Sequence, residues 1–261
     1  MHAKFCINCG TEIPLQANFC PNCGTPVEIV NQIIPKMTNG SENGHEWVDL
    51  GLSVKWAACN VGANSPEDLG SRFAWGEISS KESFSWTNYR YLAVLRGFID
   101  PDTIRVIDRR TKSFISRNAD LIEEMWSYVQ THLTKYTNSD GISHLDISDD
   151  AARVNWGGRW RLPSESEFGE LRSKCMWEWT IIGGTSGFKV IGPNGNSIFL
   201  PANGAKDKSI PFGVFWSSDL NRDDPVYARG FNIKKWEDEP PTFQMKGWGR
   251  DAGFSVRPVT D

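Results

Sequence analysis

Four cysteines near the N-terminus constrain this chain more than any other feature. Cys6 and Cys9 form one C-x-x-C pair, and Cys20 and Cys23 form a second, with ten residues between the pairs and a glycine after each. Two tight turns of this kind aim four thiolates at one tetrahedral centre, a ligand set typical of zinc that iron also accepts. Fewer than about 30 residues cannot bury a core that folds alone, so the metal would supply the folding free energy. We expect one structural zinc ion, with iron, two disulfides or four free thiols as the less favoured alternatives.

The segment FCINCGTEIPLQANFCPNCG resembles the short zinc-ribbon domains at the N-termini of many bacterial and archaeal proteins, in which F-C-x-x-C-G occurs twice. Those domains serve varied partners, so the resemblance implies the metal and a docking element and leaves the function open. We predict a ribbon at residues 1–26. The polar, aperiodic stretch that follows is predicted to be a linker over residues 27–44.

The composition is that of a globular protein with no global attraction to polyanions. The chain has 261 residues, 39% hydrophobic and 23% charged, with a formal net charge of -4. Lys4 is the one basic residue of the ribbon, which argues against a nucleic-acid partner. The N-terminus has no signal-peptide core, and no run approaches the roughly 20 apolar residues of a membrane helix. We expect a cytoplasmic protein without a membrane span.

Residues 45–261 predict one α+β domain made of short strands, few helices and much loop. Alternating apolar positions predict strands in HEWVDLGLSVKWAACNVG, FKVIGPNGNSIFLPA, GVFWSS and GFSVRPV. Helical spacing predicts one helix over 116–136 with Asn118 as its cap, and another over 164–175 opened by a capping box of Ser164 and Glu167. Five tryptophans beside glycines are expected in the core, namely Trp56, Trp75, Trp156, Trp160 and Trp216.

Six motifs in order carry a second resemblance: VDLGLSVKWAACNVG, FAWGE, DDAARVNWGGRWRLPSESEFGEL, GPNGNSIFLPA, FWSS and GFSVRPV. They resemble the Bacteroidetes and Fibrobacter proteins that carry the "major paralogous domain" of Fibrobacter succinogenes, which is similar to the C-type-lectin-like fold. The similarity spans residues 45–261, apart from an insertion at about 88–140. It extends more loosely to formylglycine-generating enzymes, through Arg161 to Phe168, and to the variable proteins of diversity-generating retroelements. The resemblance therefore implies a C-type-lectin-like domain.

The sequence offers no catalytic centre that we can identify. The oxidase relatives use a cysteine pair near the C-terminal end of this fold, and here no cysteine follows Cys175. None of the four histidines lies in a motif with a nucleophile or a metal ligand. The acidic cluster of Asp146, Asp149 and Asp150 matches no calcium loop, so a solvated turn and helix cap are expected. Arg161 is expected to pair with Glu165 or Glu167. We expect no enzyme activity.

The segment DLNRDDPVYARGFNIKKWEDEPPTFQMKGWGRDA, residues 219–252, is dense in arginine and aromatic residues and is expected to be mostly loop. In the retroelement variable proteins this stretch is rewritten to bind new targets. The resemblance thus implies a ligand-binding set at Asn221, Arg222, Asp224, Tyr227, Arg229, Trp236, Met245, Trp248 and Arg250.

These features favour a non-enzymatic protein that presents a C-terminal loop surface to a protein or other macromolecule. One alternative is an ordinary solvated loop with core tryptophans. Another is an enzyme of the formylglycine-generating superfamily that has lost or changed its activity. The basic insertion at 88–140 is interleaved with acidic residues, so it is expected to be a solvated surface.

Overall fold

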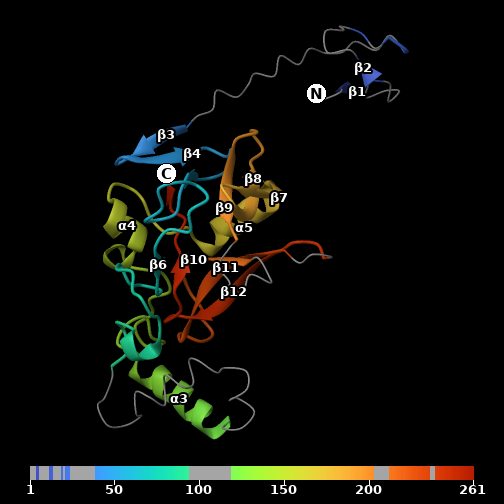
Figure 1. Ribbon diagram of the computed structural model, residues 1–261. Helices are drawn as coiled ribbons and strands as arrows, with labels where there is room; N and C mark the ends of the chain where they lie inside the picture. Colours follow the sequence, from blue (N-terminus) through green and yellow to red (C-terminus); the bar gives the residue numbers. More distant parts are fainter. Residues whose placement is uncertain are drawn as a thin grey trace. The chain divides into compact units, whose positions relative to one another are not determined.

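The computed structural model divides the chain into two compact units, Met1–Thr38 and Asn39–Asp261 (Figure 1). Residues 119–125 are described by their backbone alone. The structure describes residues 4–5, 12–13, 19, 21–23, 39–93, 119–202, 212–235 and 239–261.

The larger unit begins earlier than the sequence predicts. Strand β3 (Asn39–Glu42) pairs antiparallel with β4 (His45–Val48), so the predicted linker over 27–44 is wrong at its C-terminal end. Asn43 and Gly44 form the turn with φ angles of 49° and 83°. An Asn-Gly pair is a strong signal for a two-residue hairpin turn, because both positions adopt positive φ readily. The polar composition that suggested a flexible tether is that of an exposed hairpin.

Three sheets make up the described part of the larger unit. Their strand orders are β12-β11-β10-β13-β6, β14-β5-β4-β3 and β7-β8-β9. The strands not yet bounded are β5 (Lys55–Ala57), β6 (Arg72–Phe73), β7 (Met176–Ile182), β8 (Thr185–Ile191), β9 (Ser197–Pro201), β10 (Phe212–Leu220), β11 (Tyr227–Lys234), β12 (Thr242–Gly249), β13 (Phe254–Ser255) and β14 (Val259–Thr260). The helices are α3 (Ala119–His132), α4 (Ala151–Trp156) and α5 (Glu165–Lys174), with 3-10 turns at Trp86–Asn88 and Ile147–Asp149.

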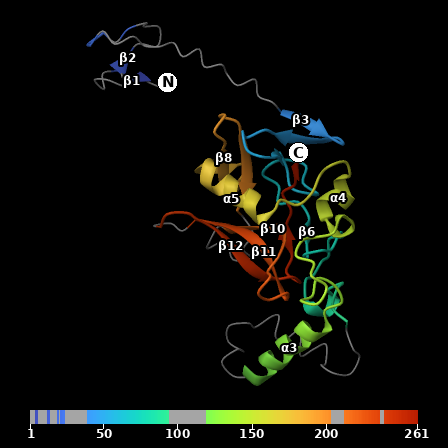
Figure 2. The ribbon, with the colours of Figure 1, turned by 180° about the vertical axis from the view of Figure 1, so that it is seen from behind.

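Helix α5 is packed between two of these sheets. Its buried Phe168 and Leu171 share one core cluster with Phe188 of β8 and with Phe231 and Ile233 of β11. Helix α3 and the β3–β4 hairpin lie at opposite ends of the larger unit, with the five-stranded sheet between them (Figure 1, Figure 2). None of the helices in the described ranges combines the length and apolar character needed to cross a bilayer.

The predicted core tryptophans are confirmed. All five are buried, and the indole N–H groups of Trp75 and Trp216 donate to the backbone carbonyls of Ser217 and Phe73. These two bonds link β10 to the β6 region, which are far apart in the sequence. Each of these bonds replaces the hydrogen bond to water that the indole N–H loses on burial.

A buried arginine explains part of the C-terminal motif GFSVRPV. The guanidinium of Arg257 donates to Asn60 Oδ1 and to the carbonyls of Ala57, Ala58 and Phe199, at 2.7–3.0 Å. Burial lowers the pKa of Arg257 to about 10, so the group stays charged at neutral pH. It ties the end of β5 and the loop after it to β9.

The predicted strands and the second helix are confirmed in the structure, including the turn at Pro193–Gly195, where Gly195 has φ 85°. The first predicted helix is present as α3, which begins and ends inside the predicted range. Its predicted cap, Asn118, lies outside the described residues.

The corner between Arg161 and α5 contains the predicted ion pair and capping box. Arg161 holds both carboxylate oxygens of Glu167 at 2.7 and 2.9 Å, whereas Glu165 pairs with Arg229. The Ser164 hydroxyl accepts from the Glu167 amide, and Glu167 accepts in return from the Ser164 amide. Burial alone would raise the pKa of Glu167, but the bonds from Arg161 and the Ser164 amide outweigh it and lower this pKa.

Glu167→Gln should lower the free energy of unfolding of the larger unit by about 1–3 kcal/mol at pH 7, because it removes a charge-assisted bidentate pair. Folding lowers the pKa of Glu167 below 4.5, the ordinary value for a glutamate carboxyl in the unfolded chain. The ionised carboxylate therefore stabilises the folded state fully above pH 4.5. This contribution is lost as the pH falls through the lower pKa of the folded state. The difference in the free energy of unfolding between wild type and variant should therefore shrink as the pH falls below about 4.5. Urea titrations from pH 7 to 3 measure it, with the exposed Glu178→Gln as control. A gap that does not change with pH would contradict this assignment.

Candidate functional site

The predicted metal site lies in the small unit. Strand β1 (Lys4–Phe5) pairs antiparallel with β2 (Glu12–Ile13), so the first C-x-x-C pair lies in the connection between two paired strands. Cys23 is exposed and closes a turn over 21–23, whereas Cys6, Cys9 and Cys20 lie outside the described residues. Four thiolates in two C-x-x-C pairs fit zinc by their chemistry, because thiolates are ligands that structural zinc prefers.

The late segment is a β-hairpin and not the predicted loop. Strands β11 and β12 pair over eight positions, from Tyr227↔Gly249 to Lys234↔Thr242. The alternation from Phe243 to Lys246 is a strand signal, but two prolines before it and two glycines after it obscured the pattern. The hairpin places four of the nine predicted binding residues on defined faces, namely Tyr227, Arg229, Met245 and Trp248.

Three of the predicted binding residues lie in the turn between β10 and β11. The side-chain oxygens of Asn221 and Asp224 accept from the amides of Asp223 and Val226, at 3.3 and 3.1 Å. Such Asx turns fix the backbone and occupy the oxygens that a ligand would need. Arg222 is exposed, and its closest polar contact is Ser143 Oγ at 3.4 Å. Arg222 is thus the most accessible member of this group.

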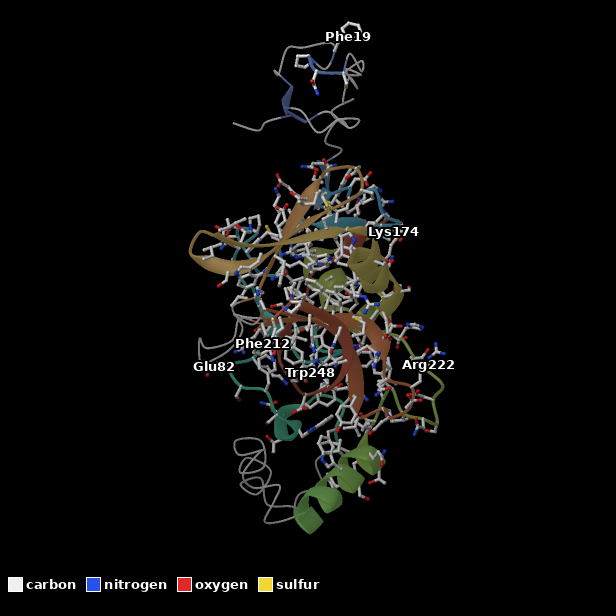
Figure 3. All side chains as sticks on the ribbon, turned by 90° about the vertical axis from the view of Figure 1, so that its right-hand side faces the viewer. Phe19, Glu82, Lys174, Phe212, Arg222 and Trp248 are labelled. Carbon is white, nitrogen blue, oxygen red and sulfur yellow. The ribbon has the colours of Figure 1, made fainter. Side chains whose placement is uncertain are left out.

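The two aromatic candidates within the described residues are half-buried and pack against neighbouring rings. Tyr227 stacks on Trp126 of α3 with 5.6 Å between ring centroids, and burial raises its pKa. Trp248 donates to Asn232 Oδ1 at 2.9 Å and meets Phe254 edge to face. Arg222 and Trp248 lie on separate parts of the unit (Figure 3). The described candidates therefore divide between the turn and the hairpin, and Trp236 lies outside the described residues.

Arg250 is a structural residue, which corrects its prediction as an outward-facing ligand contact. Its side chain is fully buried, and its guanidinium donates to Tyr89 Oη and to the carbonyls of Tyr136, Pro225 and Lys135, at 2.8–3.1 Å. The group also lies 5.2 Å from the ring centre of Trp75. Every direction from which a ligand could approach is filled.

A cavity of about 350 Å³ lies between α5 and the hairpin. Of the predicted set, Met245 lines it, and Arg229 lies at its margin through a two-bond ion pair with Glu165 at 2.6 and 3.0 Å. The cavity is lined by Glu165, Gly169, Arg172, Phe231, Gln244, Met245 and Lys246. Sequence reasoning missed the α5 side of this cavity, because Arg172 and Glu165 are about 70 residues from the hairpin in the chain.

The acidic cluster is buried rather than a solvated turn, apart from Asp146. Asp149 accepts from Lys135 and from the Tyr136 hydroxyl, each at 2.6 Å. Asp150 caps α4 through the amides of Ala152 and Arg153, as predicted. These bonds use the carboxylates internally, and the described part of the chain contains no group of three or more potential metal ligands.

Two further observations concern nucleophiles and bases. Burial raises the pKa of Cys175 to about 11 and also raises that of Cys59, so neither thiol is activated.

The fold brings His144 to Asp219, with 3.1 Å between Nδ1 and Oδ1, a pair that no motif indicated. The His144 ring is about half exposed at 54%.

Comparison with known proteins identifies one family. No curated protein and no solved structure matches the chain significantly. Residues 5–27 match the family model of the zinc-ribbon domain. The matched residues include all four predicted cysteine ligands. The chain therefore carries a zinc-ribbon domain at its N-terminal end.

Proposed function

We propose that this protein is a non-enzymatic binding module, in which the β11–β12 hairpin and the turn before it form the recognition surface. The observation that carries the proposal is the cavity of about 350 Å³ between α5 and the hairpin. The hairpin is anchored from within by Phe231 and by the buried Arg250 that follows it. A rigid base beside accessible arginine and aromatic side chains is typical of binding surfaces.

The remaining elements of the proposal follow from the resemblances in the sequence. The larger unit would be a C-type-lectin-like scaffold, and its ligand a protein or other macromolecule in the cytoplasm. The zinc ribbon would serve as a docking or assembly element. The protein would belong with the variable proteins of diversity-generating retroelements if its late segment is rewritten in the same way.

An enzyme of the formylglycine-generating superfamily with lost or changed activity fits the site less well. That chemistry depends on reactive thiols, and burial raises the pKa of both Cys59 and Cys175. The cavity between α5 and β12 contains no cysteine or histidine among its lining residues. Its charged and amide groups suit binding better than covalent catalysis.

The triple variant Arg222→Ala, Tyr227→Ala, Arg229→Ala should lose at least tenfold in retention of a partner, because it removes the accessible guanidiniums and the ring beside α3. The full chain is used as bait, and the captured protein is identified by mass spectrometry. Lys189→Ala, an exposed cation on β8, is the matched control. Thermal melts of all three proteins exclude unfolding as the cause. Equal retention by wild type and triple variant would reject this surface as the binding site.

A further inference from the structure

Among the described residues, strand β12 is the edge of a sheet. It is the terminal strand of the five-stranded sheet, and in the described chain its one strand partner is β11. Half of the N–H and C=O groups of its eight residues therefore point away from β11. Such an edge is a template for a further strand, and proteins either protect it or use it to bind extended peptides.

The cavity between α5 and the hairpin opens along this edge. Three consecutive β12 residues line it, namely Gln244, Met245 and Lys246. Because side chains alternate between the faces of a strand, a cavity lined by three successive residues must border the backbone itself. The opposite wall is α5, where an ideal Cβ on Gly169 would meet nothing within 4 Å. The strand and the helix thus bound a groove with room for another chain.

The groove has an apolar floor and a cationic margin. Phe231 and Met245 form the floor, and Arg172 reaches from α5 to the Phe243 carbonyl at 3.4 Å. Lys246 is exposed and makes no salt bridge with the described residues. The one carboxylate in the lining, that of Glu165, is neutralised by Arg229 at 2.6 Å. The groove therefore carries a net positive charge from Arg172 and Lys246.

We propose that the groove binds an extended acidic peptide segment of a partner protein, which adds to β12 as a sixth strand. Alternate peptide side chains then face the groove, about 7 Å apart. An apolar side chain covers Met245 and Phe231, and an acidic side chain two residues away on the same face meets Arg172. The acidic side chain between them faces Lys246, which lies on the other face of the β12 edge. This inference rests on the proposed function and names its ligand class.

Charge also distinguishes this occupant from a second copy of the chain. Pairing of β12 with β12 would bring Arg172 and Lys246 of both copies to one interface, where like charges repel. An acidic strand satisfies the same backbone edge and neutralises these cations. Charge complementarity thus favours a separate acidic segment.

The test uses the full chain and fluorescein-labelled peptides STLEETS and STEELTS, with STLKKTS as the charge-reversed control. We expect one of the acidic peptides to bind and the lysine peptide to bind at least tenfold more weakly. Arg172→Gln and Lys246→Gln should each weaken binding about fivefold to tenfold. Lys174→Gln is the matched control on the same helix, because Lys174 is exposed and pairs with Glu170 (Figure 3). It should leave the affinity unchanged.

Methylation of single peptide amides tests the strand geometry. An N-methyl group at every second position should abolish binding, because those amides face β12, whereas the positions between should tolerate it. The proposal would be overturned if N-methylation at every peptide position left binding unchanged. It would also be overturned if neither Arg172→Gln nor Lys246→Gln changed the affinity for the acidic peptides. Self-association through β12 in size-exclusion chromatography would overturn it as well. A captured partner whose retention survives both substitutions would reject the groove and leave the proposed function in place.

Discussion

Replacing Arg250 by alanine should lower the free energy of unfolding of the larger unit by about 3–5 kcal/mol, because it breaks a buried hydrogen-bond network and such changes are among the largest single-residue effects. The truncation leaves three carbonyls and the Tyr89 hydroxyl without their donor in the interior. Each buried polar group that loses its partner costs about 1–3 kcal/mol. Loss of the contacts with the rings of Trp75, Tyr89 and Tyr136 adds to this.

The measurement is a urea titration followed by tryptophan fluorescence. Arg222→Ala is the matched control, since it removes the same side chain from an exposed position of the same segment and should change stability by less than about 0.5 kcal/mol. Arg250→Lys should be intermediate, because an ammonium keeps the charge and cannot span four acceptors. A loss below about 1 kcal/mol together with weaker partner binding would restore Arg250 to the binding set.

Removing the metal should unfold the zinc ribbon completely and leave the larger unit folded. The ribbon has too few residues to bury a core, and binding free energies of about 10–16 kcal/mol are typical of structural zinc in such peptides. The two units are separately compact, so the loss should not spread. A chelator titration with a zinc-release dye and a proton–nitrogen NMR spectrum measure both effects in one sample.

Cys9→Ser should reproduce the effect of the chelator, because three thiolates cannot close the tetrahedral site. Cys59→Ala is the control, as Cys59 belongs to the larger unit and should leave zinc stoichiometry unchanged. One cooperative transition that removes both units together would contradict the two-domain organisation. A visible absorption band in the metal-loaded protein would show iron instead of zinc.

The elements that the sequence predicts well are those whose signals are local. The capping box of Ser164 and Glu167 occupies four consecutive residues, and the turn at Pro193–Gly195 depends on one glycine with positive φ. The two C-x-x-C pairs likewise predict the zinc ribbon, which the family match to residues 5–27 supports. In each case the residues that make the interaction are neighbours in the chain.

The predictions that were wrong concern residues whose role depends on distant partners. The Asn43–Gly44 turn is the exception, because its hairpin signal is local and its polar composition also suggests a tether. Strand β12 depends on β11 lying beside it. Arg250 has the composition of a binding-loop arginine. It is buried because Tyr89 and Tyr136, more than 100 residues away, provide its acceptors.

The sequence by itself therefore determined the zinc-ribbon domain, the aromatic core and the local caps and turns of this protein. Only the tertiary structure decided which late residues are accessible, and it alone brought Arg172 of α5 and Lys246 of β12 to the lining of one cavity. The physical reason is that exposure and charge at a surface groove are properties of pairs of elements. Such pairs form by packing over long separations in the chain, and no local pattern encodes them.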